Sequence, residues 1–436
     1  MEEYDPTKEI ADKIFDRSKR IFLNLIFFRD PTPPWYRKFY QKCNKLFDKH
    51  YKDFIISNNK RTYRANSNIR RYQKNLQHLR FLLEDNPTPE YDKIAYQHFT
   101  SRKFNRYLTE VQNLFLEMRG VRERLKPRSF IGRLNYAYES FDMAPRYVKI
   151  SFFNLLKNSL KGHMNINYDP HHQISPPHFF YFFKVKQRKI RNIRLATPTS
   201  QELFQDVEII PEFNAFLRSL KKQKKRHLYV NLQRRTKSFF SDESKRTSII
   251  EGLEDEFQNC LTVVTLDKDS SFYHQYNNFR EHYDPEAFKK DVIEQIVDNK
   301  DGYYFFPKMV LDLNLKRFLL SAFDEIYVKY FHLKTVLSVG ERVNFIELLH
   351  INIVEWLLKS LEFDSINISC KDSIDRAGSM NALLYLFFCR KESKNFEERW
   401  PVIALMPAVT VKRRNMLKDR YDIMVSVARR IIQIKN

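Results

Sequence analysis

Glycine is scarce in this sequence: a chain of 436 residues has seven, whereas average usage of about 7% would give about thirty. The four cysteines lack regular spacing, which excludes a disulfide framework or a zinc site and favours a reducing compartment. The longest apolar stretch, residues 21 to 28, is far shorter than the roughly 20 residues of a membrane span. The N-terminus lacks the basic segment of a secretory signal. We therefore expect a soluble protein, or one that binds membranes peripherally.

Acidic residues are also in deficit, because 53 Asp and Glu face 76 Lys and Arg, for a formal net charge of +23. A charge of this size favours polyanionic partners such as anionic membrane surfaces, nucleic acid or phosphorylated ligands. No aromatic RNA-binding motif or helix-turn-helix spacing is present, so we do not expect nucleic acid as the partner. The densest cluster, "KKQKKR" at 221–226, is predicted to be a membrane-surface patch or a solvated run. Nothing in the sequence indicates an oligomeric state.

The chain divides into two regions. Residues 1–130 are predicted to be mainly helical, and prolines separate the apolar periodic segments; the expected helices cover 6–28, 35–83 and 90–125. Residues 145–436 are predicted to form an α/β domain with a partly parallel sheet, because strand and helix patterns alternate. The expected strands lie within 178–195, 227–235, 261–273 and 365–369. The expected helices cover 241–257, 285–297, 309–335 and 342–361, with another after residue 376.

The segment "INISCKDSIDRAGS" places Cys370 directly after a strand and Arg376 at the start of a helix. Loop amides and a helix N-terminus both direct donors at a bound anion. The same dipole favours a cysteine thiolate, which is a nucleophile. An arginine can donate two hydrogen bonds to a phosphoryl group through the transition state. The pattern therefore predicts a phosphate-binding loop with Cys370 as nucleophile and Arg376 as phosphate ligand, and Ser373 and Ile374 line the cradle.

This Cys-x5-Arg segment resembles the cysteine-based phosphatases. Its interior, Cys370-Lys-Asp-Ser-Ile-Asp-Arg376, is similar to the Sac-type phosphoinositide phosphatases, whose loop runs Cys-x-Asp-x-Leu/Ile-Asp-Arg. With "HLYVNLQRR", "VVTLDKDSSFYHQ" and "ERVNFIELLH", the chain resembles the bacterial effector phosphoinositide 3-phosphatases (SidF/SidP type) over about 145–400. The resemblance implies a fold of the cysteine-phosphatase kind, removal of the 3-phosphate from a phosphoinositide headgroup, and secretion into a host cell to act on endomembranes. It also implies that Lys371 binds a second phosphate.

Two residues are candidates for the carboxylic acid that protonates the leaving oxygen. Asp372 lies within the loop, and Asp267 lies at the C-terminal end of the strand at 261–266, which is expected to be adjacent. Of the loop carboxylates Asp372 and Asp375, one is expected to pair with a basic neighbour. Lys268 is a candidate phosphate contact. The basic residues after the strand at 227–235 are either contacts for a ring phosphate or a solvated turn: Arg234, Arg235 and Lys237.

No cofactor is expected, and the histidines His163, His171, His172 and His178 lack ligand spacing with carboxylates or cysteines, so no metal is expected. Two alternatives to a phosphoinositide phosphatase stay open. One is a soluble inositol-polyphosphate or protein phosphatase, because the same loop serves all of these substrates. The other is a non-catalytic basic protein that binds lipid or another polyanion. The loop has no glycine, so a left-handed residue within it must be Ser373, Asp372 or a neighbour.

Overall fold

A computed structural model describes residues 89–100, 177–200, 207–237, 243–391, 395–412 and 414–434, with isolated residues elsewhere up to 139 and residue 393. The helices expected over 6–28 and 35–83 lie outside the described residues, apart from Lys42. Of the helix expected over 90–125, the structure describes α4 (Pro89–Thr100) in full. This helix packs on α9 (Pro211–Lys222), where the rings of Phe99 and Phe216 stack with centroids 4.6 Å apart.

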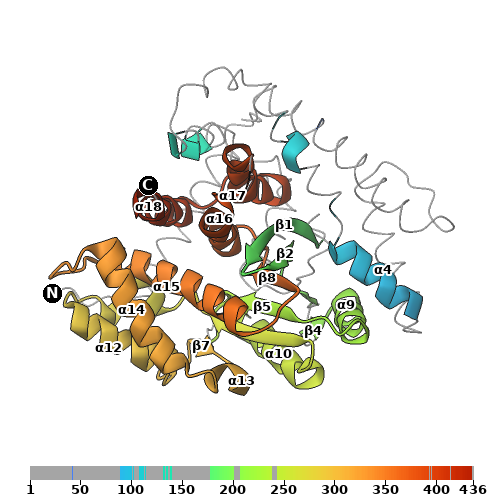
Figure 1. Ribbon diagram of the computed structural model, residues 1–436, viewed down its shortest axis with the longest axis horizontal. Helices are drawn as coiled ribbons and strands as arrows, with labels where there is room; N and C mark the ends of the chain where they lie inside the picture. The colour runs from blue at the N-terminus through green and yellow to red at the C-terminus, as the bar shows by residue number, and fades with distance from the viewer. Residues whose placement is uncertain are drawn as a thin grey trace, which may run out of the picture.

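The domain is a mixed α/β structure around a six-stranded, mostly parallel sheet flanked by helices (Figure 1). The strand order is β1-β2-β8-β5-β6-β7. The strands are β1 (His178–Val185), β2 (Arg188–Arg194), β5 (His227–Asn231), β6 (Leu261–Leu266), β7 (Tyr304–Phe305) and β8 (Ser365–Ser369). Strands β2, β8, β5 and β6 run parallel, whereas β1 and β7 pair antiparallel at the two ends. The partly parallel sheet predicted from the sequence is confirmed.

Each face of the sheet is covered by its own layer of helices, because alternate side chains of a strand point to opposite faces. On β5, Leu228 and Val230 enter the larger core, which contains residues of α15 (Val339–Ser360) and α16 (Arg376–Cys389). Tyr229, between them, enters a second core with residues of α9 and α10 (Glu243–Phe257). All residues of β5, β6 and β8 are buried, and β6 is mostly apolar, as expected of a strand covered on both faces, whereas in β8 two isoleucines alternate with buried polar residues.

The strand that precedes the Cys370–Arg376 segment, β8, is central in the sheet. β8 lies between β2 and β5, with Ile368 in register with Val230. All five of its residues are buried. Because β8 is central, the loop that follows it is surrounded by the loops that follow its parallel neighbours. This is the position at which open α/β sheets bind ligands.

The helices predicted between 241 and 390 are observed with one correction, whereas α9 and the two C-terminal helices were not predicted. The helix predicted over 309–335 is divided in two at Asn314, whose backbone is left-handed and whose side chain accepts the N–H of Arg317 at 3.2 Å. The remaining elements are β3 (Thr199–Ser200), β4 (Glu208–Ile209), α11 (Ser271–His274), η2 (Asn277–Phe279), α12 (Pro285–Ile296), α13 (Lys308–Leu311), α14 (Leu315–Phe331), α17 (Phe396–Lys412) and α18 (Lys418–Ile434). None of the described helices has the length and apolar character needed to cross a membrane.

Candidate active site

The candidate site lies at the carboxyl edge of the four parallel strands. Since these strands share a direction, the segments that follow them meet at one edge of the sheet. Those segments begin at Leu195 after β2, at Leu232 after β5, at Asp267 after β6 and at Cys370 after β8. Residues far apart in the sequence thus become neighbours of Cys370, whose side chain is buried.

The loop from Cys370 to Arg376 turns tightly without glycine. The left-handed position falls on Ser373, with φ of 52°. Its amide donates to the carbonyl of Cys370 at 3.0 Å, and its hydroxyl donates to the carbonyl of Ile368 at 3.2 Å. These two bonds fold the loop back onto β8. They also correct the expectation that the Ser373 amide faces the anion, because that N–H is used within the turn.

Neighbouring segments hold the loop from outside. The amide of Thr197, after β2, donates to the carbonyl of Lys371 at 3.2 Å. The guanidinium of Arg194, itself buried, donates to the carbonyl of Asp372 at 3.1 Å. Both acceptors are main-chain oxygens, so the loop carbonyls are directed toward the sheet. Because these carbonyls point away from the interior of the loop, backbone N–H donors can face that interior.

Four consecutive amides at the start of α16 supply these donors. Among the residues that the structure describes, none accepts a hydrogen bond from the backbone N–H groups of Ile374, Asp375, Arg376 or Ala377. Such N–H groups are the ones that the first turn of any helix leaves without an intrahelical partner. With the helix dipole they favour an anion beside Cys370. Ile374 contributes through its amide, because its side chain is buried.

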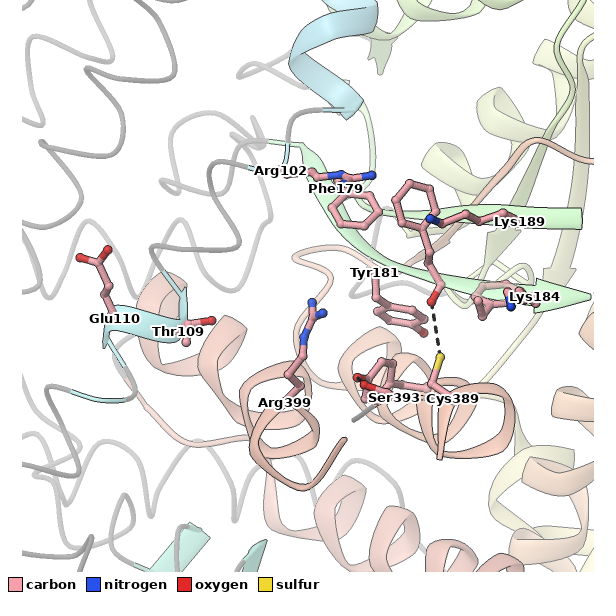
Figure 2. A pocket seen from close by; sticks show the side chains of 13 residues that line it. Arg102, Thr109, Glu110, Phe179, Tyr181, Lys184, Lys189, Cys389, Ser393 and Arg399 are labelled. Atoms are coloured by element: carbon pink, nitrogen blue, oxygen red, sulfur yellow. Dashed lines mark hydrogen bonds between the residues drawn. The ribbon is translucent and has the colours of Figure 1, made fainter. Parts of the chain in front are cut away.

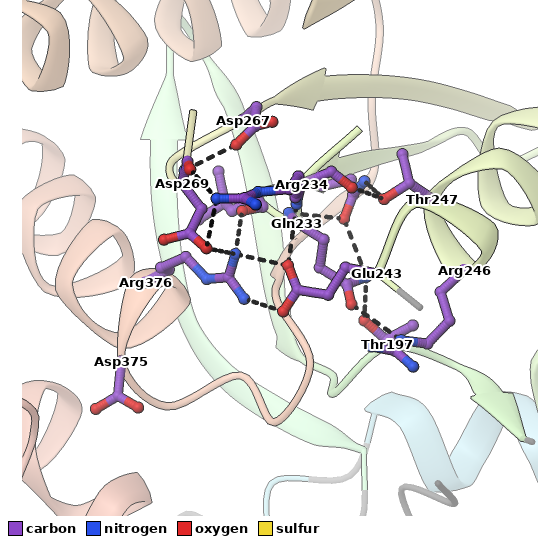
Figure 3. Close-up of polar contacts among 12 residues, drawn as sticks. Thr197, Gln233, Arg234, Glu243, Arg246, Thr247, Asp267, Asp269, Asp375 and Arg376 are labelled. Atoms are coloured by element: carbon purple, nitrogen blue, oxygen red, sulfur yellow. Dashed lines mark hydrogen bonds and ion pairs between the residues drawn. The ribbon is translucent and has the colours of Figure 1, made fainter. Parts of the chain in front are cut away.

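Arg376 is held by the carboxylate of Glu243, whose side chain is 13% exposed (Figure 3). Its two terminal nitrogens donate to the two carboxylate oxygens of Glu243 at 2.9 and 2.6 Å, and one of them also lies 3.3 Å from the carbonyl of Leu232. Burial alone would raise the pKa of Glu243, but the Arg376 guanidinium lowers it below its ordinary value. The pair fixes the plane of the guanidinium. Arg376 and Lys268 both interact electrostatically with Cys370.

The sequence-predicted aspartates have different surroundings. Asp267 is fully buried and accepts the amides of Arg235 at 3.1 Å and Asp269 at 2.7 Å. Burial raises its pKa to about 7. It is therefore turned toward its own backbone neighbours, and the structure does not show the expected position over the loop. Asp372 lies partly exposed within the loop.

One of the two loop carboxylates, Asp372 or Asp375, was expected to pair with a basic neighbour, and Asp375 is the one that does. Its oxygens accept from both terminal nitrogens of Arg414 at 2.9 and 2.6 Å, and one also accepts the amide of Leu417 at 3.0 Å. These bonds tie the Cys370–Arg376 loop to the segment that connects α17 and α18. Asp375 thus orients the loop and has no free oxygen directed at its interior in this arrangement.

Only some of the basic residues that were predicted to contact phosphate are accessible at this edge of the sheet. Lys371 is partly exposed in the loop, and Lys237 is exposed beyond β5. Lys268 is instead buried, with its ammonium 2.5 Å from Glu347, a residue of α15. Arg235 is also directed elsewhere, because its guanidinium donates to Glu251 at 3.1 Å and to the carbonyl of Gly302 at 3.0 Å.

One carboxylate at this edge was not foreseen from the sequence. Asp269 has three guanidinium groups around it: Arg420 at 3.2 Å, Arg234 at 3.8 Å and Arg376 at 4.0 Å. Arg234 also donates to the main-chain carbonyl of Asp269 at 2.8 Å (Figure 3). Arg420 comes from α18, 151 positions along the chain, so no local pattern signals the contact.

The cationic run at 221–226 lies at the opposite edge. It ends immediately before β5 begins at His227, whereas the catalytic segments follow the carboxyl ends of the strands. Lys222 pairs with Asp92 of α4 at 2.8 Å. The run therefore does not share a surface with Cys370. If the site faces a membrane, this patch points away from it.

A separate cavity lies beyond the edge strand β1 (Figure 2). It has a volume of about 640 Å³ and is lined by aromatic and basic side chains together with Cys389. Cys389 ends α16 and Arg376 begins it, and a helix of 14 residues is about 20 Å long. The Cys389 thiol donates to the carbonyl of Phe182 at 3.5 Å. This cavity is thus distinct from the loop of Cys370.

The arrangement around Cys370 combines a buried thiol, a row of amide donors and a fixed guanidinium, groups that are chemically able to bind an anion and to attack a phosphoryl group. Within the described residues, no three His, Cys, Asp or Glu side chains form a group suited to a metal ion. The chain matches no known family model, no curated protein and no solved structure.

Proposed function

We propose that the protein is a cysteine-dependent phosphatase whose substrate is a phosphoinositide. The single observation that carries the proposal is the loop itself: Cys370 leaves the central strand, the chain reverses at Ser373, and Arg376 enters α16 held by Glu243. In this mechanism Cys370 attacks phosphorus and the leaving inositol oxygen takes a proton from a carboxyl group. Water then hydrolyses the phosphocysteine.

The phosphoinositide rather than a phosphoprotein is favoured by charge at the mouth of the site. Lys371 directly follows the nucleophile and is accessible, and Arg234 and Arg420 lie beside Arg376 around Asp269. A headgroup with several phosphates matches such a concentration of cations. Removal of the 3-phosphate, secretion into a host cell and action on endomembranes are proposed on the family resemblance.

The test of the function is phosphate release from a panel of phosphoinositides, soluble inositol phosphates and phosphopeptides. Release from the lipids ahead of the other two classes supports the proposal. A preference for soluble inositol phosphates or phosphopeptides selects the alternative phosphatase. Binding of anionic lipid without any release, in the wild type as in a Cys370→Ser variant, leaves the non-catalytic alternative.

Replacing Lys371 by alanine is expected to reduce activity chiefly on lipids with two or more phosphates. The lysine sits next to the nucleophile, where its ammonium reaches a phosphate on the neighbouring ring carbon. Loss of a hydrogen bond to a charged group costs about 1.5–3 kcal/mol, so kcat/KM is expected to fall about 10- to 100-fold on a bisphosphate. Steady-state kinetics on mono- and bisphosphorylated lipids measure the difference; equal losses on both contradict it.

Membrane binding is expected to depend on cations at the catalytic edge. Lys237 is exposed beyond β5, and Lys418 is exposed next to Leu417, whose amide binds Asp375. Each cation near an anionic surface contributes about 1 kcal/mol, so replacing both by glutamine is expected to weaken vesicle binding roughly thirtyfold. Binding of the wild type is expected to weaken as salt rises.

The matched control for this vesicle experiment is at the other edge. Lys221 and Lys224 are also exposed, but they belong to the 221–226 run. Replacing this pair by glutamine removes the same charge and is expected to change vesicle binding less than twofold. Pelleting with vesicles that contain anionic lipid measures both pairs. A larger loss from the control pair shows that the membrane lies at the opposite edge of the sheet.

A further inference from the structure

Asp269 is the carboxylate that lies beside the phosphate-binding arginine with room for a substrate. Its side chain is 39% exposed, and one of its oxygens lies 4.0 Å from Arg376. Three other carboxylates at this edge have partners: Asp267 accepts two backbone amides in the interior, Asp375 binds Arg414, and Glu243 binds Arg376. Asp372 lies partly exposed within the loop. Because Asp269 is the partly exposed carboxylate 4.0 Å from Arg376, a phosphoryl group bound by Arg376 would lie near it.

The cluster around Asp269 holds its carboxylate in place from three elements. Arg420 of α18 contacts one oxygen at 3.2 Å, the imidazole of His274 lies 3.5 Å from the same oxygen, and Arg234 follows β5. Arg420 is itself buried, and one of its terminal nitrogens has no hydrogen-bond acceptor among the described residues.

We propose that Asp269 is the acid that protonates the leaving inositol oxygen, an inference that rests on the proposed phosphatase function. Cys370 thiolate forms the sulfur–phosphorus bond while the phosphorus–oxygen bond breaks. The electron pair of that bond goes to the inositol oxygen, which takes the proton of Asp269. In the second step, water attacks phosphorus and gives its proton to the Asp269 carboxylate, and the Cys370 thiolate leaves.

The arginine cluster explains how Asp269 acquires the proton. Partial burial raises the pKa of Asp269, but the hydrogen bond with His274 and the guanidinium groups of Arg376, Arg420 and Arg234 lower it well below its ordinary value in the free protein. A bound phosphate brings two negative charges to the same arginines and lies beside the carboxylate. Both effects disfavour the ionised form, so substrate binding raises the pKa.

The charged groups that face Asp269 all contribute to this balance. They are Arg234, His274, Arg376 and Arg420 as donors, with the carboxylates of Asp267 and Glu243 nearby. Phosphate binding therefore shifts Asp269 toward its protonated form, and release of the phosphate returns it to the ionised form that the arginines stabilise.

The test uses two substrates that differ only in the leaving group. Phenol has a pKa of about 10, like the tyrosine side chain, whereas the nitro group of 4-nitrophenyl phosphate makes its leaving group stable without a proton. Loss of a general acid costs about 10²- to 10⁴-fold when the leaving group needs the proton. In Asp269→Asn, activity on phenyl phosphate is expected to fall at least about 10²-fold, whereas activity on 4-nitrophenyl phosphate is expected to fall less than about 10-fold.

A structural role for Asp269 predicts a different result, which is an equal loss on both substrates. Asp269→Glu retains a carboxyl group and is expected to recover part of the phenyl phosphate activity, so the inference does not depend on the folding of one variant. In the wild type, deprotonation of the acid is expected to lower kcat at high pH. In Asp269→Asn this decrease is expected to be absent. The control is Asp255→Asn, an exposed aspartate near the end of α10.

The outcomes separate this inference from the function on which it rests. Selective loss of phenyl phosphate activity in Asp372→Asn or Asp267→Asn, with none in Asp269→Asn, overturns the assignment but leaves the phosphatase standing. Equal losses on both substrates in Asp269→Asn overturn the assignment in the same way. A wild type that releases no phosphate from either compound or from any lipid overturns both.

Discussion

Replacing Cys370 by serine is expected to reduce phosphate release below about 1% of wild type, because a hydroxyl does not replace a thiolate as nucleophile in this loop. Binding of the headgroup is expected to persist. The amides of Ile374 to Ala377 and the guanidinium of Arg376 are unchanged by the substitution, and the anionic charge of the thiolate is removed. Calorimetric titration with a soluble headgroup measures binding, and phosphate release measures turnover.

The matched control for this substitution is the other cysteine of the same helix region, Cys389→Ser. Cys389 is as buried as Cys370, and its thiol donates to the carbonyl of Phe182, away from the loop. Its turnover is expected to stay within about twofold of wild type. Turnover of several per cent in Cys370→Ser rules out the phosphocysteine mechanism.

The second large effect is expected from Arg376→Lys, which retains the positive charge. The two terminal nitrogens of the arginine donate to both oxygens of Glu243, and the planar guanidinium has further N–H donors, whereas an ammonium is a compact point charge. A lysine drawn to the buried Glu243 leaves the phosphoryl group without its ligand. Removal of one such transition-state donor costs about 10²- to 10³-fold in kcat.

The folding control for Arg376→Lys is thermal unfolding, because a buried carboxylate without a partner destabilises a protein. A further substitution, Glu243→Gln in the Arg376→Lys background, removes the competing charge. We expect it to restore stability without restoring kcat. Turnover of Arg376→Lys within fivefold of wild type shows that the planar guanidinium is not required.

Local pattern was sufficient for the strand, the turn and the helix that build the loop. Strands β5 and β8 were predicted from short segments that contain β-branched or aromatic residues, and the absence of glycine restricted the left-handed position to a few residues that include Ser373. These features depend on neighbours within a few positions in the chain. Sequence reasoning therefore predicted the nucleophile and the phosphate ligand of the proposed mechanism in their structural context.

Long-range contacts were not predictable in the same way. Glu243 lies 133 positions from Arg376, and the choice of this carboxylate depends on where α10 begins relative to β8. Lys268 follows a strand and was expected to reach the ligand, but α15 places Glu347 beneath it and buries the pair. Such pairings are decided by the order of strands in the sheet, which alternation of polar and apolar residues does not encode.

The strand order also sets when the site can exist during synthesis. Strand β5 ends at Asn231, yet the strand that joins it to β2 is β8, which begins only at Ser365. Until the ribosome has released that segment, β2 and β5 present unpaired edges to each other, and such edges favour aggregation. Pairing across so long a stretch of chain is slow to form. Cys370, Arg376 and Arg420 all follow this late strand in the sequence, so the proposed site is assembled only after β8 has been synthesised.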